Sequence, residues 1–167
     1  MQSGGFLCEE MTKEIPLTQG MVAIVDDEDF ERVSQYKWRA LKSRNTFYAR
    51  RSTPRPDRKT VLLHRFIIDA PEEYEVDHKD HNGLNCTRNN IRLATHSQNQ
   101  GNRIMDFDNR NGYKGVTCSN GKWKSQIQVG NGKHKHLGRF DDILEAARAY
   151  DKAARELFGE FAKTNFD

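Results

Sequence analysis

The chain has 167 residues, a length typical of one domain or of two small ones. Hydrophobic residues make up 35% and charged residues 31%, which is too polar for one large core, while 10% aromatic residues are too many for a disordered chain. The longest apolar run, Met21 to Val25, is far shorter than the ~20 residues of a transmembrane helix. We therefore expect two small modules and no membrane partner.

The three cysteines are odd in number and widely spaced, at Cys8, Cys86 and Cys118. No C-x-x-C pair occurs, so neither a disulfide framework nor a four-cysteine zinc site is expected. The first residues show neither a basic start nor a long apolar stretch, and they do not indicate a signal peptide. We expect a cytoplasmic location, with residues 1–13 as a flexible leader.

Charge is segregated along the chain, although the net charge is only +3. Residues 37–65 contain ten basic and one acidic side chain, and residues 111–139 contain six basic and no acidic ones. Two basic stretches in a nearly neutral chain indicate two surfaces for a polyanion. Two solvated hairpins would carry the same charge, so charge alone leaves both interpretations open.

In chain order, the hydrophobic pattern first predicts a buried strand at 21–25 and a short helix at 29–36. A hairpin is expected at 38–50, followed at 61–68 by an apolar strand that runs into a turn or short helix. Residues 77–92 are polar and rich in turn-forming residues. Thr95 is expected to cap a helix that ends near Arg103, with Gln98 completing a capping box.

Beyond a polar linker at 106–112, three strands are predicted at 113–117, 123–129 and 134–140. A helix then runs from a cap at Asp141 or Asp142 to Phe158, and Gly159 follows its end. Its apolar face is expected to comprise Ile143, Ala147, Tyr150, Ala154 and Leu157.

Asp77 and His78 are neighbouring residues whose side chains can bind a metal ion and transfer a proton, and they are the strongest candidates for a functional site in the sequence. A carboxylate suits Mg²⁺ or Mn²⁺, and a neutral imidazole suits a general base near pH 7. His96, Asn99 and either Asn102 or Arg103 fall on one face of the downstream helix, from which the Asn99 amide oxygen could complete a metal site. Two alternatives remain at this point: a loop tied together by Asx turns, and a zinc site formed by His78, His81, Cys86 and His96.

The same stretch resembles the HNH nucleases, and among them the phage and mobile-element (homing) branch. The residues that carry the resemblance are Leu63-His64-Arg65, Asp77-His78, Leu84-Asn85, Asn89-Asn90-Ile91-Arg92 and Ala94-Thr95-His96-Ser97-Gln98-Asn99. The resemblance covers about residues 15–103 and implies a small α+β nuclease domain of the ββα-metal type at 14–105.

Several residue roles follow from this resemblance. It implies that Asp77 and Asn99 bind Mg²⁺ or Mn²⁺, that His78 is the general base, and that Asn90 orders the catalytic loop. Asn102 or His96 could replace Asn99 as the third ligand. His64 is expected either to support the site or to pack in a strand.

The C-terminal third resembles the plant ethylene-response-factor (AP-two/ERF) DNA-binding domain. The matching residues are Tyr113-Lys114-Gly115-Val116, Gly121-Lys122-Trp123, Leu137-Gly138-Arg139-Phe140, the stretch 145–154, and Asn165-Phe166. This resemblance implies, for residues 113–167, a three-stranded antiparallel sheet packed on one helix and laid in the DNA major groove. Trp123 and Phe140 are expected in its core.

DNA contacts are expected from both basic stretches. The resemblance to the plant domain implies, by position, that the base-reading residues are Lys114, Thr117, Ser119, Gln126, Gln128, His134 and His136. Phosphate contacts are expected from Lys122, Lys124, Lys133 and Lys135, and from Arg50 and Arg51 in the first basic stretch.

The sequence therefore predicts a bacterial or phage-encoded endonuclease that acts on double-stranded DNA as a monomer or a homodimer. It would use Mg²⁺ or Mn²⁺ and leave 5′-phosphate and 3′-hydroxyl ends, with the C-terminal module positioning the nuclease on DNA. The alternative is a non-catalytic, sequence-specific DNA-binding regulator.

Overall fold

The computed structural model describes residues 11–104, 111–130 and 132–166. The chain divides into two compact units: unit 1 comprises residues 1–71 and 78–92, and unit 2 comprises residues 72–77 and 93–167. Most of the expected leader and of the expected linker at 106–112 lie outside the described residues. Within the described ranges, no helix is both long and apolar enough to cross a membrane.

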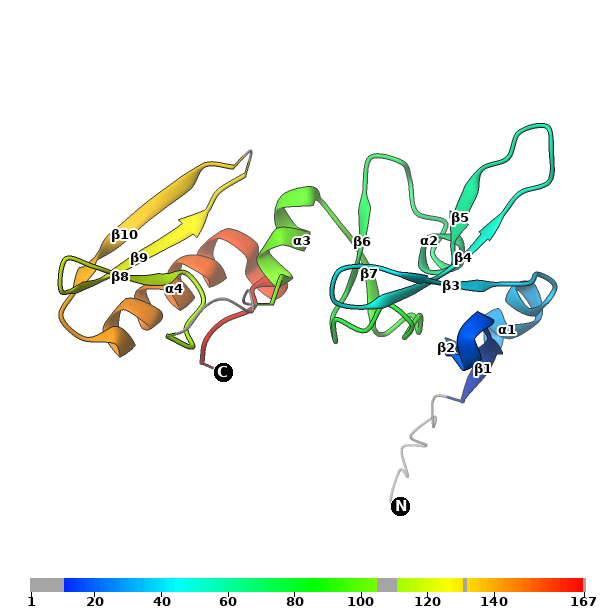
Figure 1. Cartoon of the computed structure of the whole chain (residues 1–167), viewed down its shortest axis with the longest axis horizontal. Coiled ribbons are helices and arrows are strands. Elements are labelled where there is room, and N and C mark those ends of the chain that lie inside the picture. Colours follow the sequence, from blue (N-terminus) through cyan, green and yellow to red (C-terminus); the bar gives the residue numbers. More distant parts are fainter. Residues whose placement is uncertain (1–10, 105–110, 131, 167) are drawn as a thin grey trace, which may run out of the picture. The chain divides into compact units, whose positions relative to one another are not determined.

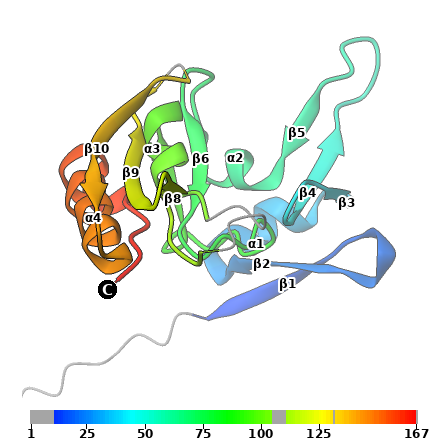
Figure 2. The same ribbon diagram turned by 60° about the vertical axis from the view of Figure 1, so that its left-hand side comes forward.

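Unit 1 begins with an antiparallel strand pair, β1 (Thr12–Pro16) and β2 (Val22–Asp26), which the 3₁₀ turn η1 (Thr18–Gly20) connects (Figure 2). The sequence pattern predicts β2 but not β1, because only Ile15 of β1 is buried. Helix α1 (Asp27–Ser34) begins two residues earlier than predicted. Three acidic residues in its first turn suit the positive end of the helix dipole.

The second sheet of unit 1 has the antiparallel order β3 (Arg39–Lys42), β4 (Phe47–Ser52), β5 (Thr60–Leu62) (Figure 1). The predicted hairpin is confirmed, and the apolar run continues from β5 into helix α2 (Leu63–Ile67). Because Arg39 pairs with Arg50, and Arg50 pairs with Leu62, these residues share one face of the sheet. Tyr48, two residues before Arg50, lies on that same face.

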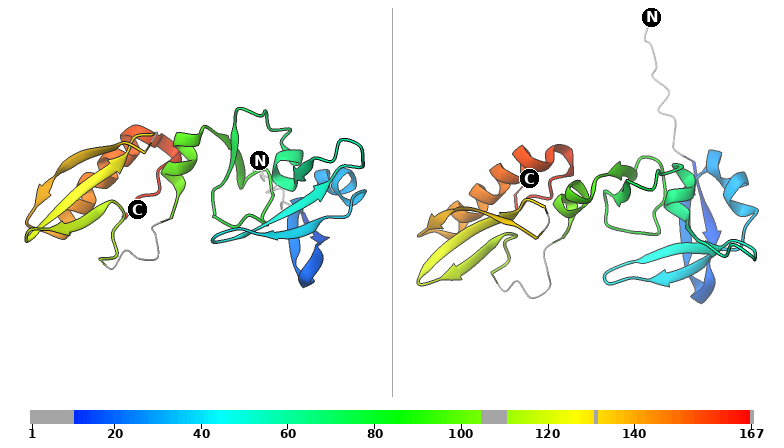
Figure 3. Two further views of the ribbon diagram at one scale, coloured as in Figure 1. Left: turned by 45° about the horizontal axis from the view of Figure 1, so that its top comes forward. Right: turned by 90° about the horizontal axis from the view of Figure 1, so that it is seen from above.

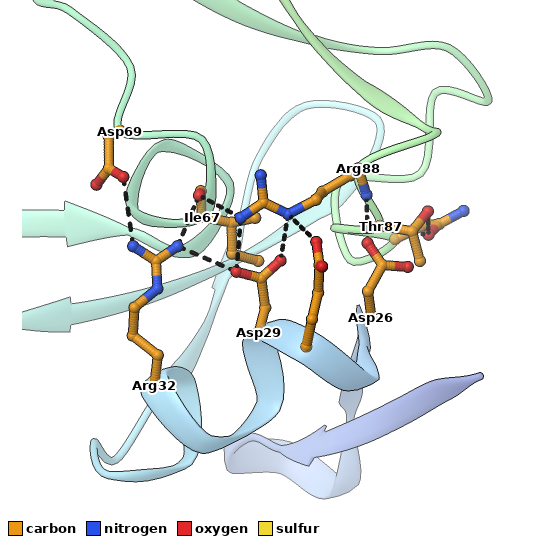
Figure 4. Close-up of polar contacts among 9 residues, drawn as sticks. Asp26, Asp29, Arg32, Ile67, Asp69, Thr87 and Arg88 are labelled. Atoms are coloured by element: carbon orange, nitrogen blue, oxygen red, sulfur yellow. Dashed lines mark hydrogen bonds and ion pairs between the residues drawn. The ribbon is translucent and has the colours of Figure 1, made fainter. Parts of the chain in front are cut away.

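A charged network holds α1 against the segment around Arg88 and against the end of α2 (Figure 4). Asp29, only 3% exposed, accepts hydrogen bonds from Arg88 at 2.8 and 2.9 Å and from Arg32 at 3.1 Å. The Arg88 backbone N–H donates to Asp26, and Arg32 donates to the Ile67 carbonyl, both at 2.7 Å. Since a buried carboxylate is costly unless it is paired, this network determines how the three segments pack.

Strands β6 (Glu75–His78) and β7 (Ile91–Ala94) form a two-stranded sheet, and the chain passes between the two units within each strand. Helix α3 (His96–Asn102) follows β7. The predicted capping box is confirmed: the Gln98 N–H donates to the Thr95 hydroxyl, and the Thr95 N–H donates to the Gln98 side chain at 2.8 Å.

Unit 2 contains an antiparallel sheet in the order β10 (His134–Phe140), β9 (Lys122–Gln128), β8 (Val116–Ser119), with helix α4 (Ile143–Phe158) against one face (Figure 3). A 3₁₀ turn, η2 (Gly159–Phe161), follows α4. The α+β fold and the three-stranded sheet packed on one helix are therefore confirmed. The core comprises Ala94, Ile127, Tyr150, Ala154, Phe158 and Phe161, with Trp123 and Phe140 packed around Val116 and Ala147.

Two local expectations about unit 2 are wrong. Leu157 was expected on the buried face of α4, but it is 45% exposed. At the end of the helix the next residue, Phe158, is buried instead. The first strand begins at Val116 rather than at Tyr113. Gly115 interrupts it with a φ of +74°, and a Cβ at this position would lie 2.0 Å from the Tyr150 ring, so only glycine fits.

Helix α3 belongs to unit 2. A Cβ at Gly101 of α3 would lie 2.5 Å from the Phe158 ring of α4. The Gly101 carbonyl accepts hydrogen bonds from the Lys114 ammonium at 2.8 Å and from the Lys163 N–H at 3.2 Å. These contacts join α3 to the C-terminal sheet and helix.

Candidate functional site

Asp77 and His78 end strand β6, and both are buried, with exposed fractions of 3% and 6%. Successive side chains of a strand point to opposite faces, so the carboxylate and the imidazole face different surroundings. Glu75 shares the face of Asp77. One face of the strand, the acidic face, thus carries the two carboxylates, and the other carries the imidazole.

On the acidic face, α3 supplies the partners of both carboxylates. Asn102, which is buried, donates a side-chain N–H to Asp77 Oδ1 at 2.7 Å. Asn99 donates to Glu75 Oε2 at 2.5 Å, and His96 Nδ1 lies 2.7 Å from Glu75 Oε1. The structure therefore brings all three predicted α3 residues to one face, with Asn102 rather than Asn99 in contact with Asp77. Glu75 is not among the residues predicted from the sequence, and its only signal is its place two residues before Asp77.

On the other side of β6, His78 lies in an aromatic cluster of unit 1. Its ring centroid is 5.0 Å from that of His64 on α2 and 5.7 Å from that of Tyr48 on β4. His64 is 5% exposed, and its Nδ1 has no hydrogen-bond partner within the described part of the chain. Burial lowers the pKa of His64 to about 3, with smaller contributions from His78 and Arg65, so this imidazole is neutral at pH 7.

The loop that follows His78 is ordered by side-chain amides. Asn90 donates to Asp80 Oδ1 at 2.9 Å and to the Asn85 carbonyl at 2.7 Å, while its own oxygen accepts from the Asp80 N–H at 3.0 Å. Burial alone would raise the pKa of Asp80, but hydrogen bonds from Asn85, Asn82 and Asn90 outweigh it and lower the pKa. The loop also contains an Asx turn of the kind that the first alternative invokes, with Asp80 accepting from the Asn82 N–H at 2.8 Å.

His81 and Gly83 shape the same loop. His81 has a φ of +64°, and its N–H donates to the His78 carbonyl at 3.0 Å, so the chain reverses directly after the imidazole. A Cβ at Gly83 would lie 2.5 Å from the Phe47 carbonyl oxygen and 2.6 Å from the Tyr48 ring. Gly83 thus lets the loop lie against the ring that contacts His78.

The structure does not support the alternative of a zinc site formed by His78, His81, Cys86 and His96. In the ranges that the structure describes, no three His, Cys, Asp or Glu side chains are arranged to hold a metal ion. Burial also raises the pKa of the Cys86 thiol to about 12. A magnesium site built from one carboxylate and one amide would not form such a cluster, because it draws its remaining ligands from water and phosphate.

The face of the C-terminal sheet that points away from α4 is polar. Ser125 and Ile127 of β9 are buried, so the alternate residues Lys124, Gln126 and Gln128 occupy the opposite face. Strand register places their neighbours on the same face: Thr117, Ser119, Lys122, His134, His136 and Arg139. We call these nine residues the open face. Sequence reasoning missed Arg139, because a bulge between His136 and Gly138 shifts the register of β10.

Five residues expected at DNA lie elsewhere or have other partners, and one of them, Lys122, pairs with Asp141 at 3.1 Å. The Lys114 ammonium lies over the Tyr150 ring and donates to the Gly101 carbonyl, and burial lowers its pKa to about 8.

Lys135 pairs with the buried Ile127, so it lies on the helix side of the sheet, and Lys133 precedes the strand. The Arg51 guanidinium stacks on the Tyr36 ring at 4.0 Å, whereas Arg50 is exposed.

Comparison with known proteins identifies the family. Residues 69–100 match the family model described as HNH endonuclease. The chain is 35% identical over 153 residues to the "Uncharacterized HNH endonuclease L560" of Acanthamoeba polyphaga mimivirus, which covers 88% of this chain and 76% of that protein. It is 33% identical over 95 residues to "Protein 3.8" of Escherichia phage T7, covering 56% and 77% of the two chains. The chain belongs to the HNH endonuclease family.

Plant proteins match a second, shorter part. The chain is 55% identical over 47 residues to the "Ethylene-responsive transcription factor ERF084" of Arabidopsis thaliana, covering 28% of this chain and 18% of that protein. It is 46% identical over 56 residues to the "Dehydration-responsive element-binding protein 2A" of Oryza sativa subsp. indica, covering 32% and 20%. These matches support a fused module of the AP-two/ERF type. No solved structure shows a significant match to the chain.

Proposed function

We propose that this HNH-family protein is a metal-dependent, homing-type DNA endonuclease whose active site is built around Asp77 and His78. The observation that carries the proposal is the position of these two buried residues at the end of β6, with the amides of α3 on the acidic face of that strand. In this proposal Asp77 binds a divalent cation, and the neighbouring His78 accepts a proton.

The side chains on the acidic face suit Mg²⁺ or Mn²⁺. Both ions prefer oxygen ligands, and Mg²⁺ in particular keeps several waters while binding one or two protein groups. Asp77 offers a carboxylate and Asn99 an amide oxygen, while Asn102 donates its N–H to Asp77 and so orients the carboxylate. Asp77 and Asn99 are thus the proposed ligands. When bound, the cation would stabilise negative charge on the phosphate and on the leaving oxygen.

His78 is the proposed general base. Its imidazole takes a proton from a water molecule, whose oxygen forms a bond to the scissile phosphorus while the bond from phosphorus to the 3′ oxygen breaks. The leaving oxygen gains a proton from solvent, so the products carry 5′-phosphate and 3′-hydroxyl ends. The rings of Tyr48 and His64 hold the imidazole in place, and Asn90 fixes the loop behind it.

DNA binding is proposed for one face of each unit. In unit 1, Arg39 and Arg50 are exposed on the face of the β3–β5 sheet that carries Tyr48, whose ring contacts His78. Guanidinium groups there would bind phosphates next to the proposed base. In unit 2, the open face would read base edges and position the nuclease on double-stranded DNA. One active site per chain cuts one strand, so a monomer nicks and a homodimer makes paired cuts.

The second candidate function is a non-catalytic DNA-binding regulator, which the similarity to plant transcription factors favours. Plasmid DNA separates the two candidates. We expect nicking of supercoiled plasmid by the full chain with Mg²⁺ and none with EDTA. Binding without cleavage under all metal conditions would overturn the nuclease and leave the regulator.

A further inference from the structure

Two rows of side chains meet between β6 and α3 within unit 2. Glu75 and Asp77 lie on one face of the strand, and Asn99 and Asn102 lie on one face of the helix, three residues apart. The Asn99 amide donates to Glu75 at 2.5 Å, and the Asn102 amide donates to Asp77 at 2.7 Å. Each carboxylate of β6 therefore receives an amide N–H from α3.

Glu75 is held by α3 at both of its oxygens. Oε2 accepts from Asn99, and Oε1 lies 2.7 Å from Nδ1 of His96, three residues earlier on the helix. The Glu75 side chain is 40% exposed and that of His96 is 68% exposed. The carboxylate therefore lies at the surface, where its charge is readily hydrated, and rotation about its side chain would break at least one of the two contacts.

The direction of the Asn99 hydrogen bond has a chemical consequence. An ionised carboxylate can only accept hydrogen bonds, so Glu75 selects the NH₂ end of the Asn99 amide and disfavours the reversed orientation. The amide oxygen then faces away from Glu75. A divalent cation requires that oxygen, because the NH₂ end of an amide cannot act as its ligand.

We infer that Glu75 is a positioning residue that fixes the amide orientation of Asn99 for binding a divalent cation. This inference rests on the proposed function, which makes Asn99 a ligand. His96 supports Glu75 from its other oxygen. Neither residue transfers a proton or contacts the reacting phosphate in this role, and Glu75 has no sequence-predicted function.

Mn²⁺ titrated into the full-length protein without DNA tests the inference directly by calorimetry. Glu75→Leu keeps a similar size but removes both acceptor oxygens, so we expect the Mn²⁺ affinity to fall about 10–100-fold. Glu75→Gln retains one acceptor oxygen for the Asn99 N–H, so we expect its affinity to stay within about threefold of the parent protein. Glu75→Ala serves as a second deletion of the acceptor if Glu75→Leu fails to fold.

The matched control is Glu73→Leu, which removes the same charge at an exposed position two residues earlier. Unchanged Mn²⁺ affinity in Glu75→Leu or Glu75→Ala, or an equal loss in Glu73→Leu, would overturn the inference. Asp77→Ala and Asn99→Ala separate this failure from failure of the proposed function. If these two variants abolish Mn²⁺ binding and Glu75→Leu does not weaken it, only the positioning role of Glu75 is wrong. If neither Asp77→Ala nor Asn99→Ala weakens Mn²⁺ binding, the proposed metal site itself is wrong.

Discussion

Asn102 donates its side-chain N–H to Asp77 across 2.7 Å, and both residues are buried. The contact joins the last residue of α3 to the carboxylate that we propose as a metal ligand. An N–H donor orients a carboxylate but does not itself bind a cation. The two asparagines therefore differ in partner, because Asn102 contacts Asp77 whereas Asn99 contacts Glu75.

The first prediction compares Asn102→Ala with Asn99→Ala. Loss of an orienting hydrogen bond typically weakens metal binding about 10–100-fold, so Asn102→Ala should need that much more Mg²⁺ for half-maximal cleavage while approaching the parental rate at saturation. Asn99→Ala removes a ligand and should also lower the rate at saturation. Cleavage rates measured against Mg²⁺ concentration test both. The reverse pattern would make Asn102 the ligand.

His78→Ala should reduce cleavage by at least about 10²–10⁴-fold, the usual contribution of a general base. DNA affinity should not change, because the imidazole contributes to the chemical step rather than to binding. Single-turnover cleavage with Mg²⁺ and fluorescence anisotropy without it measure the two quantities. A variant that cuts at the parental rate would show that His78 is not the base.

Buried His64 should make unit 1 sensitive to acid. Its pKa is about 3 in the folded chain and about 6.5 in the unfolded chain, mainly because burial disfavours the charged form. Between these values only the unfolded chain binds the proton. The free energy of unfolding should therefore fall as the pH falls from 6.5 towards 3, by up to about 1.4 kcal/mol per pH unit from this residue.

Denaturant unfolding of His64→Phe across that pH range measures the effect. The variant should show a shallower dependence of unfolding free energy on pH than the parent protein. Equal slopes in His64→Phe and the parent would show that His64 does not remain neutral in the folded chain.

Arg88→Leu should lower the free energy of unfolding by about 2–3 kcal/mol, because it leaves buried Asp29 with Arg32 as its remaining partner in the network. We expect a smaller loss than the roughly 3–5 kcal/mol that follows when a fully buried ion pair is broken, because Arg88 is itself half-exposed. Urea denaturation gives the value. Arg148→Leu, on the exposed side of α4, should change stability by less than about 0.5 kcal/mol.

Lys124 and Arg139 form a cross-strand pair on the open face. Replacing both with alanine should weaken DNA binding and reduce the magnitude of the slope of log K against log salt by about 2, one for each lost phosphate contact. Binding isotherms at several salt concentrations provide the slope. An unchanged slope, or an equal change in Arg148→Ala, would argue that DNA does not bind this face.

Much of the architecture could be predicted from local pattern. The Thr95–Gln98 capping box, the β3–β4 hairpin and the Asp142 cap of α4 each depend on residues close together in the sequence, and the structure contains all three. Strand β1 could not be predicted, because it buries only Ile15 and gains its stability by pairing with β2. The exposed Leu157 is a similar case, since the packing of η2 and α3 decides which residue at the end of α4 is buried.

The motif, the candidate base and the candidate ligands could be predicted without a structure, because they depend on residue type and spacing. The fold was needed to show which amide contacts which carboxylate, that Lys114 is withdrawn from the open face, and that α3 packs with the C-terminal sheet. A motif fixes the order of side chains along one element, whereas hydrogen-bond partners depend on how that element packs against others distant in the sequence. Glu75 illustrates the difference: its contacts with α3 lie 21 and 24 residues away along the chain.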